Sequence, residues 1–131
     1  MRNIMRSDSN DTCAQQLGSI IDIDSIIITN HARARLRERW NSSGNIDSIL
    51  HDALKEGVVE TQNGSIIQRS NGDKSECIEV YIPNEHQLGL ARFVLRQDGQ
   101  KYLLLTLYPM QEVHVPFCIL SIICPDWYFV Y

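Results

Sequence analysis

The first regular pattern in the chain is helical. Over residues 31–40 the apolar side chains of Ala32, Leu36 and Trp40 recur at every fourth position, so a helix places all three on one side. Asn30, directly before this run, is a residue type whose side chain accepts hydrogen bonds from the free N–H groups of a first helical turn. The pattern therefore predicts a helix over 31–40 with Asn30 as its N-cap.

A second helix is predicted after a short connection. Residues 41–45 (NSSGN) have the composition of a turn, and Asn45 is the expected N-cap of the helix that follows. This helix is expected to stop at Gly57, because glycine commonly terminates helices. The apolar residues between these two points repeat with a helical period: Ile46, Ile49, Leu50, Ala53 and Leu54.

Strands are predicted on both sides of the two helices. The isoleucine-rich stretch over 19–28 favours extended structure. After Gly57 the apolar period changes to two, which is the alternation of a half-buried strand. Turn residues separate the candidate strands at 62–64, 70–74, 83–86 and 97–100. The chain is thus predicted to be α+β, with the two helices packed on one face of a roughly four-stranded antiparallel sheet.

The last two predicted strands, 90–96 and 101–108, form a hairpin with two different faces. The apolar face is predicted to contain Ala91, Phe93, Leu95, Leu103, Leu105 and Leu107. The opposite face is predicted to contain Arg92, Arg96, Tyr102, Thr106 and Tyr108. The apolar face is expected to pack on the helices, which leaves the face with arginine, threonine and tyrosine open.

Three segments are predicted along the chain. Residues 1–18 contain few large apolar groups and are expected to form a disordered polar tail. Residues 19–110 form the predicted α+β domain. Residues 111–131 are strongly apolar and aromatic, and they are expected to add a strand to the sheet, with an interface to another chain as the alternative.

Composition limits the functions that this chain can have. Its 131 residues suit one domain, and 12 Lys plus Arg against 16 Asp plus Glu give a formal charge of −4. This charge argues against a protein that coats nucleic acid by bulk electrostatics, although a local basic site is still compatible with it. The four cysteines show no CxxC spacing and the four histidines are dispersed, so no metal and no other cofactor is predicted.

The expected location is cytoplasmic. No apolar run reaches the ~20 residues that cross a bilayer. The polar start of the chain lacks the apolar centre of a secretory signal. Delivery as part of a larger secreted toxin is kept as an alternative.

The candidate chemistry lies in the arginine-rich run over 29–40, TNHARARLRERW. On a helix, His31, Arg35 and Arg39 share one stripe, while Arg33 and Arg37 form a second pair one turn apart. Such a concentration of positive charge favours an anionic ligand. The alternative is that the arginines are solvated or pair with nearby carboxylates, for which the sequence offers Asp22, Asp24, Asp47 and Asp52.

These motifs resemble those of a known family. The HARxRLxxR spacing over 31–39, a VVE strand at 58–60 and a last strand ending in LLTLYP are similar to the DUF4258 family. That family is related to the RelE and BrnT toxins of the barnase–EndoU–colicin–RelE group of metal-independent ribonucleases. The resemblance covers residues 26–109 and aligns the family's histidine and arginine with His31 and Arg35. It aligns the polar residues of the family's last strand with Thr106 and Tyr108.

The resemblance implies a toxin-like endoribonuclease that cleaves mRNA or tRNA by attack of a 2′-OH on the adjacent phosphate. Its implied catalytic residues are His31, Arg35, Thr106 and Tyr108. Five further arginines are expected to bind substrate phosphates, because guanidinium groups bind them bidentately: Arg33, Arg37, Arg39, Arg92 and Arg96. Its implied partners are RNA and an antitoxin or immunity protein, and the oligomeric state is left open.

Two other functions remain open at the level of sequence. The negative net charge and the apolar C-terminal segment are also typical of a non-catalytic protein-interaction module on the same fold. A weaker alternative is an RNA-binding protein that does not cleave its ligand.

Overall fold

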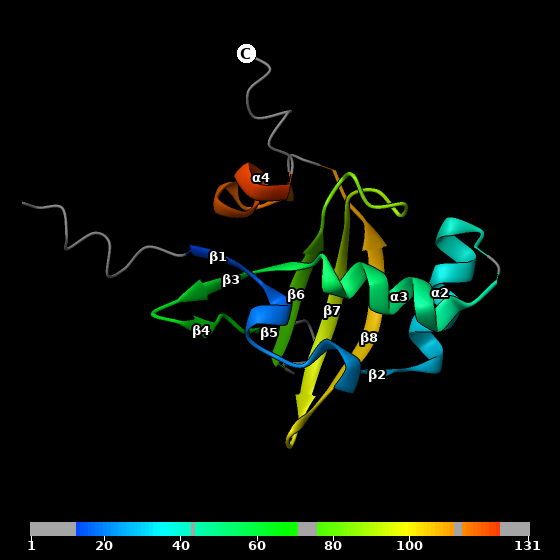
Figure 1. The fold of residues 1–131 in the computed structure, drawn as a ribbon, viewed down its shortest axis with the longest axis horizontal. Coiled ribbons are helices and arrows are strands. Elements are labelled where there is room, and N and C mark those ends of the chain that lie inside the picture. The colour runs from blue at the N-terminus through cyan, green and yellow to red at the C-terminus, as the bar shows by residue number, and fades with distance from the viewer. Residues whose placement is uncertain (1–12, 43, 71–75, 112–113, 124–131) are drawn as a thin grey trace, which may run out of the picture.

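The protein has an α+β fold built on one mixed sheet (Figure 1). The computed structural model describes residues 13–42, 44–70, 76–111 and 114–123. The described strands are β1 (Cys13–Gln16), β2 (Ile27–Ile28), β3 (Val58–Gln62), β4 (Ser65–Ile66), β5 (Arg69–Ser70), β6 (Glu76–Ile82), β7 (Ala91–Asp98) and β8 (Lys101–Pro109). The described α-helices are α2 (Asn30–Trp40), α3 (Ile46–Lys55) and α4 (Phe117–Ile123).

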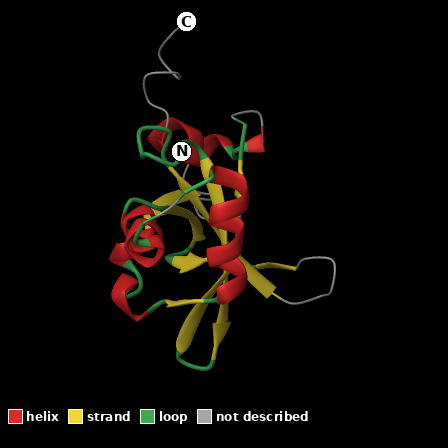
Figure 2. Cartoon of the chain, turned by 90° about the vertical axis from the view of Figure 1, so that its right-hand side faces the viewer, coloured by secondary structure: helices red, strands yellow, loops and turns green. Residues whose placement is uncertain are grey.

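The strand order is β1-β3-β6-β7-β8-β2, with β4 paired to β3 and β5 paired to β6. The order differs from a simple four-stranded meander, because additional short strands extend both edges. β2 pairs with β8 in parallel, at Ile27↔Leu103 and Ile28↔Leu104 only. The chain then leaves β2 directly into α2, which runs along β8 (Figure 2). The second half of β8 is therefore bordered by a helix instead of a strand.

The two predicted helices are present, and one of the two predicted caps is wrong. Asn45 caps α3 as expected, since its Oδ1 accepts a hydrogen bond from the Ser48 N–H at 3.1 Å. The N-cap of α2 is Thr29, and Asn30 is already helical. The Thr29 hydroxyl accepts from the Ala32 N–H at 3.1 Å and also donates to the Leu104 carbonyl at 2.7 Å. It thus fixes the start of α2 to β8, a tertiary contact that the local sequence does not show.

The main core lies between one face of the sheet and α2 and α3, as predicted. Leu36 of α2, Leu50 of α3 and Phe93 of β7 are each 0% exposed. Full burial of one such side chain contributes roughly 1.5–3 kcal/mol to folding. Trp40 packs at the rim of this core, where its Nε1 donates to the Leu88 carbonyl at 2.7 Å.

A β-bulge in β8 changes which of its residues face the core. Val94 pairs with Thr106 and Leu95 pairs with Leu104, so Leu105 is the extra residue. The core side chains of β8 are Leu104 and Leu107, both 0% exposed. The prediction that Leu103 and Leu105 face the core is therefore wrong, while that for Leu107 is confirmed. Tyr102 packs against the core instead of sharing a face with Thr106.

Both ends of the described chain differ from expectation. Residues 13–16 form β1, paired with β3, and Leu17 is fully buried, so the polar tail expected over 1–18 ends earlier than predicted. Residues 1–12 lie outside the described residues. The C-terminal strand is also wrong for 117–123, which form helix α4. Residues 112–113 and 124–131 of the predicted apolar segment are outside the described residues.

Helix α4 builds a second, smaller core on the face of the sheet opposite to α3. Its buried residues Ile119, Leu120 and Ile123 pack with Val58 and Tyr81. This face is thus covered near α4 and accessible farther along β6, β7 and β8. In the described part of the chain, no helix is long and apolar enough to cross a membrane.

Candidate active site

The accessible part of this second sheet face contains a cavity of about 200 Å³. On β7, Arg92 and Val94 point to this face, because they alternate with the core residues Ala91 and Phe93. On β8, the bulge brings Thr106 and Tyr108 to the same side. The complete lining is Arg69, Ser70, Cys77, Glu79, Arg92, Val94, Leu105, Thr106 and Tyr108.

A carboxylate lies at the centre of the polar contacts in this cavity. Glu79 of β6 accepts a hydrogen bond from the Tyr81 hydroxyl at 3.0 Å, and its other oxygen lies 3.4 Å from Arg92 Nη1. Arg69 Nε approaches the first oxygen at 3.9 Å. The side chains of Glu79 and Arg92 are 25% and 31% exposed, so both are partly shielded from water while still accessible.

Tyr81 is a fixed hydrogen-bond donor to Glu79. Burial raises the pKa of the Tyr81 hydroxyl well above its usual value, and the neighbouring negative charge of Glu79 raises it further. The hydroxyl therefore keeps its proton across the physiological range. Its hydrogen bond holds the carboxylate in one orientation toward the cavity.

Arg69 joins this carboxylate to a second one. Its Nη2 donates to Glu60 at 2.6 Å, and this hydrogen bond raises the pKa of the Arg69 guanidinium. Glu60 thus takes the nearer ion pair of Arg69, while the contact from Arg69 to Glu79 is longer. The result is that Glu79 is held by several partners without a short ion pair to any of them.

Two guanidinium groups lie against the ring of Tyr108. Arg92 Cζ is 5.1 Å from the ring centroid and Arg39 Cζ is 4.7 Å from it, both within the range of cation–π contacts. Arg92 Nε is buried and has no hydrogen-bond partner among the described residues. A buried N–H of this kind is costly unless a ligand or water accepts its hydrogen bond.

Arg39 reaches this face from the other side of the sheet. Its Nη1 donates to the Leu107 carbonyl at 2.6 Å, at the part of β8 that β2 does not cover. The guanidinium then extends past the strand to Tyr108. Arg39 is therefore the residue of α2 that crosses the edge of the sheet.

The structure divides the predicted site residues into two groups. Thr106, Tyr108, Arg92 and Arg39 meet at or beside the cavity. His31 and Arg35, predicted to be catalytic, do not line it. His31 is exposed on α2, and Arg35 Nη1 pairs with Glu38 Oε1 at 2.5 Å.

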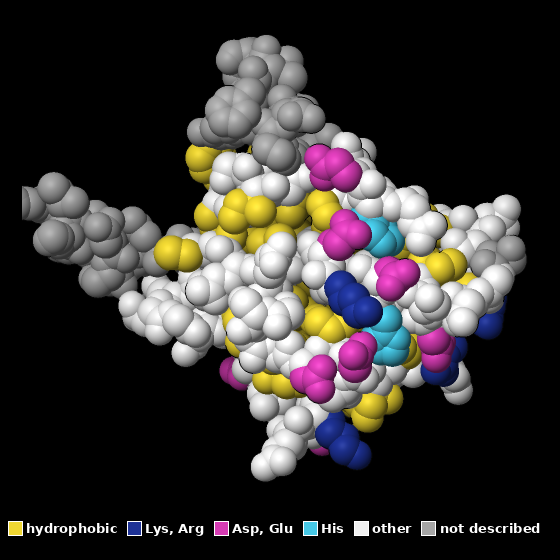
Figure 3. Space-filling model, in the orientation of Figure 1, with side chains coloured by type: hydrophobic (Ala, Val, Ile, Leu, Met, Phe, Trp, Pro, Cys, Tyr) yellow, Lys and Arg dark blue, Asp and Glu magenta, His cyan; other side chains and the backbone are white. Residues whose placement is uncertain are grey.

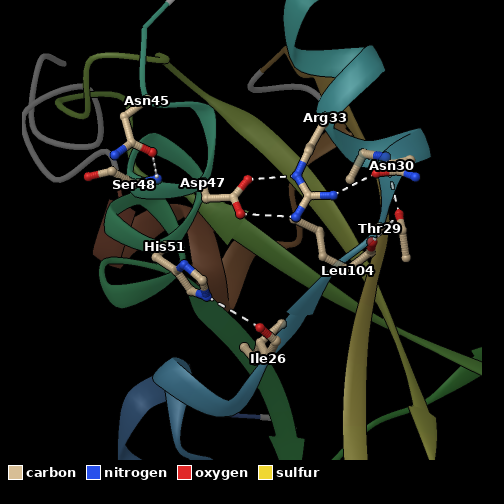
Figure 4. Close-up of polar contacts among 10 residues, drawn as sticks. Ile26, Thr29, Asn30, Arg33, Asn45, Asp47, Ser48, His51 and Leu104 are labelled. Atoms are coloured by element: carbon tan, nitrogen blue, oxygen red, sulfur yellow. Dashed lines mark hydrogen bonds and ion pairs between the residues drawn. The ribbon is translucent and has the colours of Figure 1, made fainter.

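Arg33 is committed to a structural role, which is the alternative that the sequence left open. It holds Asp47 of α3 with two hydrogen bonds, at 2.7 and 2.9 Å, and donates a third to Asn30 at 2.7 Å (Figure 4). The bond from Arg33 lowers the pKa of Asp47, and the same bond raises the pKa of Arg33. Arg37 and Arg96 are exposed and lie outside the cavity.

Glu79 and Arg69 are the site residues that the sequence interpretation missed. The alternation in ECIEVYI, residues 76–82, places Glu79 and Tyr81 on one face of a strand, and this signal was available from the sequence. Arg69 carried no such signal, because it lies in the two-residue strand β5. Its position depends on pairing with β6.

A larger cavity of about 380 Å³ lies elsewhere and has the opposite electrostatic character. It is lined by Asp52, Lys55, Glu56, Glu85, His86 and Gln87. Figure 3 shows acidic and histidine side chains gathered on the face of the molecule that carries α3. This surface would repel an anion, so the smaller cavity beside Tyr108 is the better candidate site.

The residues that the structure describes were also compared with the requirements of a metal site. There, no group of three or more His, Cys, Asp or Glu side chains is arranged to hold a metal ion. The comparisons with known proteins add no assignment: no family model, no curated protein and no solved structure matches this chain.

Proposed function

We propose that this protein is a toxin-like endoribonuclease that cleaves RNA without a metal ion, at the cavity on the sheet face. The observation that carries the proposal is that Glu79 lies 3.4 Å from Arg92 Nη1 in a cavity that Tyr108 of β8 also lines. A carboxylate, a guanidinium and a phenol in one partly shielded cavity provide a base, a phosphate ligand and a proton donor. The resemblance of residues 26–109 to the DUF4258 family supports the same class.

In the proposed reaction, Glu79 removes the proton from a ribose 2′-OH. The 2′-oxygen then forms a bond to the adjacent phosphorus, and the bond from phosphorus to the 5′-oxygen breaks. The Tyr108 hydroxyl donates a proton to this leaving oxygen. The products are a 2′,3′-cyclic phosphate and a free 5′-hydroxyl, and no water is consumed.

The arginines stabilise the charge that develops on the phosphate. Arg92 is the central one, because its side chain lines the cavity and is 31% exposed, so its guanidinium can donate to a phosphate oxygen there. Arg39 also lies against the Tyr108 ring, and the hydroxyl of Thr106 can orient the phosphate by a hydrogen bond. His31 and Arg35 have no catalytic role in this proposal, which replaces the assignment implied by family resemblance.

The biological substrate in this proposal is mRNA or tRNA, and the natural inhibitor is an antitoxin or immunity protein. Such a partner would act by covering the cavity on the sheet face.

The direct test is to incubate the purified protein with total RNA and with a defined oligoribonucleotide in EDTA. We expect cleavage products that carry 2′,3′-cyclic phosphates, identified by mass spectrometry. Glu79→Gln is expected to lower the rate by roughly 10²–10⁴-fold, the usual contribution of a general base. Glu76→Gln is the matched control, since Glu76 is exposed on the same strand and does not line the cavity.

His31→Ala separates this proposal from the sequence-based assignment. It is expected to leave the rate of cleavage of a short substrate unchanged. A folded wild type that leaves RNA intact would contradict the proposal and favour the non-catalytic interaction module. Cleavage by Glu79→Gln at the wild-type rate would remove the assigned base.

A further inference from the structure

We infer that the stripe of His31, Arg35 and Arg39 on α2 binds the phosphates of a single-stranded RNA as it passes from the cavity over the edge of β8. The inference rests on the proposed function for the location of the cleaved bond. It adds a second binding surface that extends the site beyond the cavity. The proposed ligand is a single RNA strand that extends beyond the two nucleotides joined by the cleaved bond.

The starting point is that Arg39 belongs to both surfaces. Its guanidinium lies over Tyr108 at the cavity, while its backbone is in the last turn of α2. Arg35 and His31 lie one and two turns farther along the same stripe, because residues four apart share a side of a helix. Each step is about 6 Å along the axis, and an extended strand can place successive phosphates at such a repeat.

The two flanks of α2 are clearly distinct. Ala32 and Leu36 face the core, and Arg33 turns toward α3, where it binds Asp47. Arg37 is adjacent to this α3 flank, and its charge also acts on Asp47. His31 and Arg35 lie on the other flank, the one from which Arg39 reaches the Leu107 carbonyl of β8.

The ion pair of Arg35 does not prevent this role. Arg35 and Glu38 are three residues apart on the surface, with side chains 30% and 58% exposed. An exposed pair of this kind contributes little, so a phosphate can displace the carboxylate. Glu38 is thus a competitor for Arg35, and removing its charge should strengthen binding.

The surrounding charge directs an anion to this flank. The acidic groups Asp52, Glu56 and Glu85 line the other, larger cavity on the α3 side, and an RNA strand would be repelled there. The strand must also be unpaired at the cavity, because Glu79 can reach a 2′-OH there only if the nucleotide enters a space of about 200 Å³. Both arguments favour a path in which a single RNA strand passes from the cavity beside Tyr108 to α2.

The test uses fluorescence anisotropy with 2′-O-methyl RNA, which binds but lacks the attacking hydroxyl. A dinucleotide probes the cavity alone, and a strand of about ten nucleotides probes both surfaces. Arg35→Gln is expected to weaken the long probe about fivefold and to reduce the slope of log affinity against log salt by about one. Its affinity for the dinucleotide should be unchanged.

Two variants on the same helix make the result specific. Arg37→Gln removes the same charge from the opposite flank and should leave binding of the long probe within about twofold of wild type. Glu38→Gln should tighten the long probe, because it frees Arg35. Circular dichroism of each variant checks that α2 remains folded.

Several results would overturn the inference. Equal losses in Arg35→Gln and Arg37→Gln would show a general charge effect, and equal affinity for the two probes would show that nothing beyond the cavity binds. Polyglutamate that binds with the same dependence on Arg35 would favour an acidic protein ligand over RNA. Length-dependent binding without any RNA cleavage would leave this surface standing and remove the proposed activity, whereas cleavage without length dependence would do the reverse.

Discussion

Arg39 of α2 lies 4.7 Å from the ring centroid of Tyr108 on β8, so a helix on one face of the sheet supplies a guanidinium to the other face. The same ring is 5.1 Å from Arg92. Tyr108 therefore combines two separable parts: an aromatic ring that lies against two arginines, and the hydroxyl to which the proposed reaction assigns the proton transfer.

Tyr108→Phe and Tyr108→Leu should separate these properties. Tyr108→Phe keeps the ring, so we expect stability within about 0.5 kcal/mol of wild type and a loss of RNA cleavage of about 10²-fold or more through the missing proton donor. Tyr108→Leu should lose the same activity and also about 1 kcal/mol of stability, because each cation–π contact disappears. Urea unfolding and single-turnover cleavage measure the two effects. Equal stability of the two variants would contradict the role of the ring.

Tyr81→Phe tests the positioning of the proposed base. The hydroxyl of Tyr81 touches Glu79 and does not line the cavity, so its loss should reduce kcat about tenfold with little change in KM. The phenyl ring keeps its packing against α4, which preserves the fold. A change confined to KM would instead indicate that Tyr81 contacts the substrate.

The ion pair between α2 and α3 predicts a pH dependence of stability. The hydrogen bond from Arg33 lowers the pKa of Asp47, so its stabilising effect is fully present above the ordinary aspartate pKa of about 4. It is lost as the pH falls through the lowered value. Asp47→Asn should therefore melt below wild type at pH 7 and approach it in strong acid. Asp52→Asn, an exposed change on the same helix, is the control; a constant gap between wild type and Asp47→Asn would oppose this reasoning.

Gly57 lies where a side chain would not fit, so replacing it is predicted to destabilise the fold. A Cβ atom there would lie far inside van der Waals contact with Val80 Cγ1, in the closely packed core. Gly57→Ala should cost about 1–3 kcal/mol of unfolding free energy. Gly18→Ala is a matched control, since its Cβ would lie 3.6 Å from Ile23 Cγ1, an ordinary contact. If the clash is the cause, adding Val80→Ala should recover part of the loss, and a strictly additive double variant would contradict it.

The sequence predicted those elements whose patterns are local and long enough. The period of Ala32, Leu36 and Trp40 gave α2, and the alternation of Phe93 with Arg92 gave the two faces of β7. These patterns are reliable because burial of one side follows directly from helical or extended geometry. They correctly place Arg92, Thr106 and Tyr108 together.

Other features depend on contacts that no local pattern contains. The apolar run that forms α4 lacks a clear period, so its burial could be predicted while its helical form could not. The residues of β1, CAQQ, include no large apolar side chain and gain their strand from pairing with β3. In the arginine run, the ion pair of Arg33 with Asp47 of α3 and the position of Arg35 outside the cavity both depend on tertiary structure.

The bulge at Leu105 separates two functions within a single strand. Before it, Tyr102 and Leu104 face the helices; after it, Thr106 and Tyr108 face the cavity, while Leu107 returns to the core. Because Leu105 is the extra residue, its deletion would leave Leu104 paired with Leu95 and Thr106 paired with Val94, so the side chains on both sides of it would keep their faces. The bulge therefore gives β8 one residue in reserve, since a strand shortened at Leu105 keeps both the cavity side chains and the interior.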